Sequence, residues 1–267
     1  MPVRKALIPA AGRGTRMRPV TWAVPKELLP VGTRPAIHRV VDEAAAAGLD
    51  RIGVVVGPGK ELIRQYLETA RRQGEFPGLA FEYLWQEEPK GLAEAISVGR
   101  SFTGGDPFAL LLPDNVLLSP QYHLASMTDL FERSGKDVAG VLTLDSSATG
   151  RYGNSGLFEG RSPEPGIFEI ERLLDKLPGR LEIPAGETVL RTCGRYICRP
   201  HVMRWIDELR PGIRSEFDEV PVYQRIAAEG GLFGRELPMP LFDVGHPAGF
   251  LAANAYLHQL RSTAEPS

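Results

Sequence analysis

Short apolar runs alternate with amphipathic segments through the first 112 residues, and this alternation constrains the fold more than any other feature of the chain. The predicted strands are residues 3–9, 51–56, 80–86 and 107–112, and the predicted helices are residues 35–47, 60–72 and 92–100. Strand–helix units with short connections favour parallel strands, because each helix crosses a face of the sheet before the next strand begins. The sequence therefore predicts an α/β fold with a mainly parallel sheet and helices on both faces.

The texture of the sequence changes beyond about residue 149, where glycine and proline are frequent and the predicted strands are short. The predicted strands are residues 156–158, 168–174 and 189–198, and the predicted helices are residues 201–209, 220–228 and 247–260. No internal repeat or low-complexity linker divides the chain. A chain of 267 residues can bury a sizeable core, and the sequence predicts one domain that ends in a helix.

Composition and charge exclude several classes of protein. A formal net charge of −2 gives no general attraction to nucleic acid or to an anionic membrane, so any phosphate site has to be local. No apolar run approaches the roughly 20 residues that span a bilayer. Cys193 and Cys198 would point to opposite faces of a strand, which disfavours a disulfide between them. Two cysteines without a signal peptide favour a reducing, cytoplasmic location.

A glycine-rich segment follows the first apolar run. Gly12 and Gly14 stand where the strand ends, and Arg16 and Lys26 follow with no acidic residue before Glu27. Glycine has no Cβ, so an anionic phosphate can approach the backbone N–H groups of such a turn. Arginine binds phosphate in a bidentate manner and lysine acts as a point charge. The segment predicts a site for a ligand with several phosphates, and a structural turn beside two solvated cations is the alternative interpretation.

Two common phosphate-binding motifs are absent from the chain. A dinucleotide-binding fingerprint would need glycine where Met17 stands. A P-loop around Lys60 would need glycine at Val54 and serine or threonine at Glu61. The glycine segment therefore belongs to neither class.

Polar residues follow the other predicted strands, at the edge where α/β sheets bind ligands. The Gln86 amide offers a donor and an acceptor that suit the imide edge of uracil or thymine, and the Gly91 N–H could meet the remaining carbonyl. Asp114 and Asp243 each follow an apolar run, where a carboxylate is poorly solvated without a cation, so the pair predicts Mg²⁺ ligands. A strand end with a helix N-cap at Gln86 and an Asx turn at Asp114 are the alternatives.

The string Gly12-x-Gly-Thr-Arg16, followed by Pro-Lys26-Glu-Leu-Leu-Pro, resembles the signature of sugar-1-phosphate nucleotidyltransferases, and most of all the bacterial UTP–glucose-1-phosphate uridylyltransferases. The resemblance covers residues 3–257, with the motifs in the same order. It implies a Rossmann-like, three-layer α/β/α mixed sheet of the nucleotidyltransferase type. It also implies that UTP and a sugar 1-phosphate, glucose 1-phosphate first, give a UDP-sugar and pyrophosphate with Mg²⁺ as cofactor. A homo-oligomer, either dimer or tetramer, is expected.

The same resemblance implies roles for particular segments and residues. Residues 1–148 would bind the nucleotide, residues 149–246 the sugar phosphate, and residues 247–267 would form the C-terminal helix. The implied nucleotide-binding residues are Ala10, Ala11, Gly12, Gly14, Thr15, Glu27, Gln86 and Gly91. The implied sugar-binding residues are Gly153, Asp175, Lys176, Thr192 and Cys193.

Three cations and two carboxylates have implied roles in the reaction itself. By the resemblance, Arg16 clamps the leaving pyrophosphate, Lys26 contacts the α-phosphate and Lys176 binds the incoming sugar phosphate. Asp114 and Asp243 would hold the metal ion between the two substrates.

The sequence departs from the family pattern on the sugar side. Asp175 replaces a longer glutamate, and Leu177 is inserted before Pro178. A carboxylate shortened by one methylene would lie about 1.5 Å back from a hexose hydroxyl, enough to lose a direct hydrogen bond. We therefore expect that the sugar need not be plain glucose.

Three other interpretations remain at the level of sequence. The run from Gly91 to Ala95 is nearer to the form found in glucose-1-phosphate thymidylyltransferases, which would use dTTP. The altered segments around Asp175 and Pro221 would also suit a catalytically silent relative that binds sugar nucleotides. A metal-dependent glycosyltransferase would need an Asp-x-Asp motif, and Val116 stands at its last position.

Overall fold

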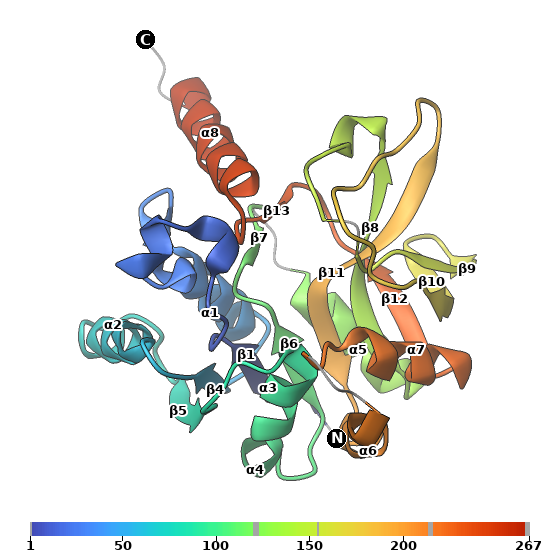
Figure 1. Ribbon diagram of the computed structural model, residues 1–267, viewed down its shortest axis with the longest axis horizontal. Helices are drawn as coiled ribbons and strands as arrows, with labels where there is room; N and C mark the ends of the chain where they lie inside the picture. The colour runs from blue at the N-terminus through green and yellow to red at the C-terminus, as the bar shows by residue number, and fades with distance from the viewer. Residues whose placement is uncertain (1, 120–122, 154, 213–215, 265–267) are drawn as a thin grey trace.

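The computed structural model describes residues 2–119, 123–153, 155–212 and 216–264. Within these residues, nine strands form one sheet in the order β5-β4-β1-β6-β11-β8-β12-β10-β9 (Figure 1). The first four of them are parallel: β1 (Lys5–Pro9), β4 (Arg51–Val56), β5 (Ala80–Trp85) and β6 (Phe108–Leu111). The predicted parallel sheet is confirmed for this half of the molecule.

The rest of the sheet is mostly antiparallel. β11 (Thr188–Cys198) runs antiparallel to β6 and to β8 (Asp137–Asp145). β12 (Leu232–Glu236) is parallel to β8, and β10 (Ile167–Leu173) and β9 (Phe158–Glu164) follow in antiparallel order. The expectation of a mainly parallel sheet is wrong here, and the mixed sheet implied by the resemblance is confirmed.

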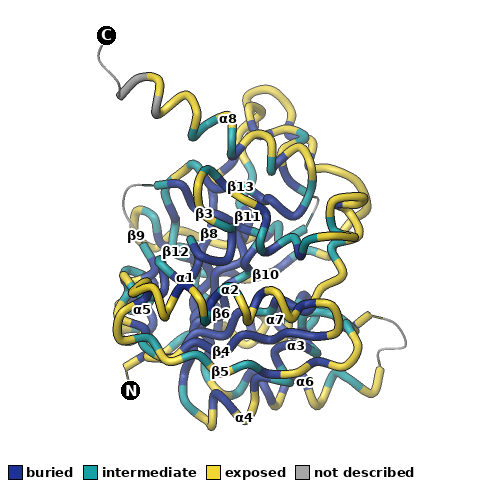
Figure 2. Tube along the Cα trace, turned by 90° about the vertical axis from the view of Figure 1, so that its left-hand side faces the viewer, coloured by how far each residue is buried: buried dark blue, intermediate teal, exposed yellow. Residues whose placement is uncertain are grey.

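Helices cover both faces of this sheet and give the predicted three layers. One face carries α1 (Ala36–Ala46), α2 (Glu61–Arg72) and α5 (Leu124–Ser134). The other face carries α3 (Leu92–Val98), α4 (Arg100–Thr103), α6 (Val202–Leu209) and α7 (Val220–Ala228). Figure 2 shows the buried residues along the sheet and the exposed ones on the outer sides of the helices.

The spacing of apolar residues explains how the layers pack. In α1, Ile37, Val40, Val41 and Ala44 are all buried against one face of the sheet, which is the predicted helical stripe. The helix ends before Gly48, whose φ of +79° is a conformation that favours glycine at a helix C-terminus.

Side chains alternate between the two faces of each strand, so a single strand contributes to the hydrophobic cores on both sides of the sheet. In β1, Ala6 and Ile8 face one core while Leu7 faces the other. In β11, Cys193 and Cys198 likewise lie in different cores, and both thiols are free. The expectation that these cysteines form no disulfide is confirmed.

Smaller elements complete the carboxyl edge of the sheet. β13 (Leu241–Asp243) pairs antiparallel with β7 (Asn115–Leu117), and β2 (Pro30–Val31) pairs with β3 (Arg34–Pro35). α8 (Pro247–Ala264) projects from the body of the molecule (Figure 1). Short 3-10 helices occur at Thr15–Met17, Val20–Trp22, Lys26–Leu28, Ser146–Ala148 and Arg210–Gly212. No helix in the described part of the chain is long and apolar enough to cross a membrane.

Candidate active site

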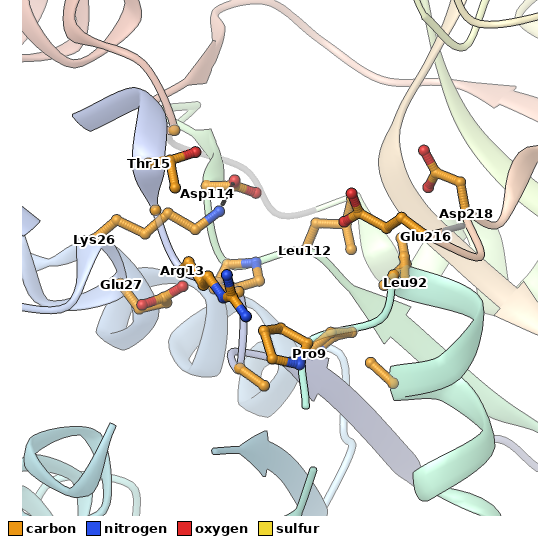
Figure 3. Close-up of a pocket in the computed structure, with 18 of the residues that line it drawn as sticks. Pro9, Arg13, Thr15, Lys26, Glu27, Leu92, Leu112, Asp114, Glu216 and Asp218 are labelled. Carbon is orange, nitrogen blue, oxygen red and sulfur yellow. Dashed lines mark hydrogen bonds and ion pairs between the residues drawn. The ribbon is translucent and has the colours of Figure 1, made fainter. Parts of the chain in front are cut away.

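One cavity of about 910 Å³ opens where the parallel strands end, which is the ligand-binding edge of α/β sheets. Its size is that of a small-molecule site. The segments after β1, β5 and β6 form most of its wall, and Glu216 and Asp218 lie across it from Lys26 and Thr15 (Figure 3). The predicted residues that line it are Ala11, Gly12, Gly14, Thr15, Arg16, Lys26, Glu27, Gln86, Gly91, Asp114 and Lys176.

The loop after β1 owes its shape to two glycines. Gly14 has a φ of +66°, and a Cβ at this position would approach Thr21 Cγ2 to 3.1 Å. Thr21 Oγ1 donates a hydrogen bond to the Gly14 carbonyl at 2.8 Å, which stabilises the turn. Nothing lies within 4 Å of the position that a Cβ on Gly12 would occupy. The backbone at Gly12 is therefore open to a phosphate group.

Lys26 and Asp114 form an ion pair in this cavity. Burial alone would lower the pKa of Lys26, but attraction to the Asp114 and Glu27 carboxylates outweighs it and raises the pKa. Burial alone would raise the pKa of Asp114, but the charges of Lys26 and Arg16 lower it overall. Both side chains are therefore charged at neutral pH.

Asp243 ends β13, where it lies opposite Asn115 of β7, the residue that follows Asp114. The two aspartates converge above Gly245. A Cβ placed on Gly245 would lie 2.6 Å from Asp114 Oδ2, 3.0 Å from Asp243 Oδ1 and 3.3 Å from Arg16 Nη2. Asp243 itself is buried and does not line this cavity, although Gly245 does.

This carboxylate pair offers the oxygen ligands that suit a divalent cation. Mg²⁺ prefers oxygen ligands and is usually held by one or two carboxylates together with waters and substrate phosphates. No group of three or more His, Cys, Asp or Glu side chains suited to a metal occurs among the described residues. A divalent ion here would rest on Asp114 and Asp243 and would take its other ligands from phosphate or water.

The wall near β5 contains two buried polar atoms that have no partner in the described structure. Gln86 is buried with Nε2 unsatisfied, and Glu27 is buried with Oε1 unsatisfied, although its Oε2 accepts from Lys60 Nζ at 2.7 Å. A buried polar atom without a hydrogen-bond partner lowers the stability of the fold. Both residues line the cavity, so a bound ligand could supply the missing partners. Gly91, which lines the same cavity, has a φ of +113°, and a Cβ there would collide with the Phe217 carbonyl. Only glycine fits this position.

Lys176 enters the cavity from the second half of the chain. Its Nζ donates to Asp218 Oδ2 at 2.8 Å, and although burial opposes the charge, Asp218 raises the pKa of Lys176. Burial would raise the pKa of Asp218, but hydrogen bonds from Glu219 and Lys176 lower it to about 2. Asp175 Oδ1 instead accepts from Gln224 Nε2 at 2.7 Å, outside the cavity wall.

Two residues predicted to contact a sugar lie in the interior. Cys193 is completely buried in the core, and burial raises the pKa of its thiol to about 12. The buried Tyr196 hydroxyl donates to Thr192 Oγ1 at 3.2 Å. The Cys193 side chain packs into the core of the sheet, so it does not line the cavity, and a sugar contact at this residue stays a prediction.

Ala10 and Gly153 also lie outside the cavity wall. Ala10 is fully buried and its N–H donates to the Val55 carbonyl at 2.8 Å, so Ala11 alone of the alanine pair lines the cavity. Gly153 forms an isolated bridge with Arg180.

The cavity wall also contains residues that the sequence analysis did not select: Arg13, Lys90, Glu216, Asp218 and Gly245. Arg13 and Lys90 lie inside the motifs already quoted, so extending each motif by its charged members would have found them. Asp218 begins the altered segment around Pro221, which the sequence analysis noted without selecting this residue, and Glu216 carries no such signal. Their segment reaches the cavity through tertiary contacts, because the Phe217 N–H donates to the Lys90 carbonyl at 2.7 Å.

Together, the fold and the site define an α/β enzyme that handles phosphate esters, since cations, carboxylates and open glycine backbone meet where its parallel strands end. The chain belongs to the nucleotidyl transferase family, whose model matches residues 5–259. Members of this family generally use a divalent metal.

Curated relatives and solved structures agree with this family. The chain is 29% identical to the UTP–glucose-1-phosphate uridylyltransferase of Bacillus subtilis (strain 168), over 93% of this chain and 89% of the relative. The protein of that name from Staphylococcus epidermidis is also 29% identical, over 93% and 90%. A UDP-glucose pyrophosphorylase solved with UDP-glucose is 27% identical and superimposes with a TM-score of 0.82 over 96% of this chain and 99% of that one. A UTP-bound structure from Acinetobacter baumannii, 24% identical, shares the fold with a TM-score of 0.78 over 96% and 93% of the two chains.

Proposed function

We propose that this protein transfers a uridylyl group from UTP to a sugar 1-phosphate, glucose 1-phosphate first, and releases pyrophosphate. The observation that carries the proposal is that groups suited to a base, to a metal with phosphates and to a sugar phosphate line one cavity. The buried Gln86 amide, the Lys26–Asp114 pair and Lys176 all line the same space. The curated relatives that match 93% of the chain carry the name of this activity, which supports the same conclusion.

The nucleotide would occupy the side formed by residues 1–148. The unsatisfied Gln86 Nε2 would donate to a carbonyl of the uracil ring, and the Gly91 backbone would meet the opposite edge. Ala11, Gly12 and the loop to Thr15 would lie along the nucleoside and its phosphates. We propose that Glu27, held by Lys60, offers its free oxygen to a donor group of the nucleotide.

The reaction needs positioning and charge neutralisation more than proton transfer. An oxygen of the sugar phosphate would form a bond to the α-phosphorus of UTP, and the bond from the α-phosphorus to the bridging oxygen would break. Pyrophosphate would leave with that electron pair. Arg16 would bind the leaving pyrophosphate, Lys26 the α-phosphate and Lys176 the attacking phosphate, so each cation offsets charge at one stage of the transfer.

We infer that Asp114 and Asp243 hold Mg²⁺. The bound ion would supply charge neutralisation at phosphate oxygens of both substrates. The Lys26 ammonium group, which pairs with Asp114 in this structure, would then bind a phosphate oxygen instead, because the metal ion would take over the charge of Asp114.

Residues 149–246 would bind the sugar, with Lys176 at its phosphate. Gly153, Asp175, Thr192 and Cys193 stay proposals as sugar contacts, although none of them lines the cavity in this structure. The run from Gly91 to Ala95 favours dTTP as a second candidate nucleotide. A homo-oligomer and a cytoplasmic location also stay predictions.

The proposal is tested by measuring pyrophosphate release from a panel of nucleotides and sugars. UTP, dTTP, CTP, GTP and ATP are each combined with glucose 1-phosphate, galactose 1-phosphate and N-acetylglucosamine 1-phosphate. Release with UTP and one of the sugars is the expected result. Preference for dTTP would assign the thymidylyl alternative, and no release with any pair would leave a protein that binds sugar nucleotides without turnover.

A substitution pair links the activity to the proposed metal ligands. Asp114→Asn should abolish metal-dependent turnover while the protein stays folded. Asp106→Asn is the matched control, because Asp106 precedes β6 and Asp114 follows it, so the two lie at opposite ends of one strand. Near-normal kcat in the Asp114 variant would overturn the metal assignment.

A further inference from the structure

A completely buried arginine lies beneath the carboxylate pair. Arg195, in β11, is 0% exposed and forms an ion pair with Glu43 of α1, whose side chain is also buried. Its Nε donates to both Glu43 oxygens at 3.1 Å, and its Nη2 donates to Glu43 Oε2 at 2.8 Å. Glu43 therefore takes up one side of the guanidinium group.

The other side of the guanidinium group holds a loop. Nη1 donates to the carbonyls of Leu112 at 3.0 Å and Gly194 at 3.3 Å, and Nη2 donates to the carbonyl of Asn115 at 2.6 Å. Each of the five N–H groups of Arg195 thus has an acceptor. The carbonyls of Leu112 and Asn115 bracket Asp114, so the arginine fixes the loop on both sides of a proposed metal ligand.

The second carboxylate depends on the same loop. The Asp114 carbonyl accepts a hydrogen bond from the Val244 N–H at 2.7 Å, and Asn115 lies opposite Asp243 in the β7–β13 pair. Moving the segment from Leu112 to Asn115 would therefore move both aspartates relative to Gly245, where they converge.

The backbone of β11 is irregular at the point that directs this side chain. The register with β8 shifts between Thr192 and Tyr196, which is a bulge, and Gly194 within it has a φ of +72°. A Cβ on Gly194 would come within 2.7 Å of Asn115 Nδ2 and 3.0 Å of Leu112 Cδ1. The bulge thus lies close against the loop, and the Arg195 side chain binds the loop carbonyls of Leu112 and Asn115.

A buried ion pair is a poor source of stability, because desolvation of the two charges offsets most of their attraction. The geometry of this ion pair does, however, fix the position of the neighbouring loop, which an apolar pair could not do. The planar guanidinium group binds a carboxylate and two loop carbonyls at once, and lysine, with one ammonium group, could not span them.

We propose that Arg195, oriented by Glu43, is a positioning residue that sets the spacing of the Asp114 and Asp243 carboxylates for a divalent ion. The inference rests on the proposed function, because it takes these aspartates as the metal ligands. It assigns to the Arg195–Glu43 pair a role in metal affinity and turnover and none in contact with substrate.

The test compares substitutions in two arginine–carboxylate ion pairs, one completely buried and one whose carboxylate is buried while its arginine is partly exposed. Arg195→Lys keeps the charge and loses the carbonyl bonds. Arg199→Lys is the matched control, because Arg199 follows the same strand and binds the buried Asp137 through Nη2 at 3.0 Å at the far end of the sheet. For each protein, Mn²⁺ affinity is measured by electron paramagnetic resonance with UTP present, together with kcat, the KM for UTP and the Tm.

Arg195→Lys should lower Mn²⁺ affinity and kcat at least tenfold with little change in the KM for UTP, which is the range seen when a metal site loses an outer partner. Arg199→Lys should lower the Tm and leave Mn²⁺ affinity within twofold. Glu43→Gln should also lower the Tm and should lower Mn²⁺ affinity less than Arg195→Lys, since glutamine keeps one acceptor oxygen for Arg195 and Arg195 keeps its loop carbonyls. Wild-type Mn²⁺ affinity in Arg195→Lys, or an equal loss in Arg199→Lys, would overturn the inference.

A second variant keeps the test decisive if Arg195→Lys does not fold. Gly194→Ala pushes the same loop from below while leaving the Arg195–Glu43 pair intact, and we expect a similar loss of Mn²⁺ affinity. Unchanged affinity in that variant would refute the positioning role. A wild-type protein that binds Mn²⁺ but releases no pyrophosphate would overturn the proposed function alone, whereas one that binds no Mn²⁺ would overturn both.

Discussion

Gly245→Ala is the smallest change that should disable the proposed metal site. A Cβ at this position would lie 2.6 Å from Asp114 Oδ2, about 0.8 Å short of the 3.4 Å at which ordinary contact begins, and 3.0 Å from Asp243 Oδ1. Metal–ligand distances vary by only about 0.2 Å within a working site. The methyl group would therefore displace at least one carboxylate by several times that tolerance without altering any charge.

The expected magnitude follows from this displacement. Losing an outer-shell partner of a metal site typically costs about 10–100-fold in affinity or activity, and moving a direct ligand should cost at least as much. Folding should change little, because Gly245 does not have the positive φ that makes a substitution strained. Replacing glycine by alanine at a compatible site gains about 0.4–1 kcal/mol through the unfolded state, which offsets part of the contact strain.

The assay is a Mn²⁺ titration with UTP present, followed by pyrophosphate release and thermal unfolding. Gly212→Ala is the control, because nothing lies within 4 Å of its Cβ position and its backbone is also free of positive φ. We expect loss of Mn²⁺ binding and turnover in the Gly245 variant, with both retained in the control. Mn²⁺ affinity within twofold of wild type in Gly245→Ala would refute the convergence of the two carboxylates on a metal.

Three further outcomes follow from the site. Lys176→Ala should raise the KM for the sugar phosphate about 10–100-fold, the equivalent of one charged hydrogen bond, with little effect on the KM for UTP. Steady-state kinetics, with Lys90→Ala measured for comparison, would test this. An equal rise in the KM for the sugar phosphate and the KM for UTP would show that Lys176 does not bind the sugar phosphate. Gln86→Leu should reduce the preference for UTP over CTP roughly tenfold in competition assays, because the base loses its amide partner, and unchanged preference would exclude Gln86 as the base reader. Burial raises the pKa of the Cys193 thiol to about 12, and burial also raises the pKa of the Cys198 thiol, so neither thiol should react with a thiol reagent at pH 8 until the protein unfolds. Because the folded pKa values lie above the unfolded ones, this contribution to stability is complete below about pH 9 and is lost as the pH rises toward 12, which urea titrations at pH 8 and pH 10.5 would measure.

The residues that line the cavity after β1 and β5 were predictable because they belong to local motifs. Gly12, Gly14 and Gln86 directly follow strands whose apolar runs are visible in the sequence, and the sheet brings the ends of parallel strands to one edge. The fold class was accessible for the same reason. No element was predicted between residues 118 and 149, where α5 and β8 lie, although β8 begins with a continuous apolar run.

The order of strands in the second half could not be obtained from apolar patterns. β8 and β12 are parallel neighbours although their paired residues, such as Asp137 and Leu232, are 95 positions apart in the sequence, and β11 lies between β6 and β8. A period of two predicts a strand but not its neighbour, because the partner is chosen by packing across the whole sheet. The mixed sheet could therefore be predicted only from the resemblance to the family.

The sugar side is harder to predict because partners distant in sequence decide what its charged groups can do. Lys176 is positioned by Asp218, and the Asp175 carboxylate is engaged by Gln224, so neither side chain's role follows from its own motif. The segment that carries Asp218 also packs through Phe217 against Gly91 on the nucleotide side. Lengthening Asp175 to glutamate would thus meet Gln224 before it met a sugar. Sugar specificity in this chain is a property of these paired contacts, and they link the sugar side to the base-binding segment.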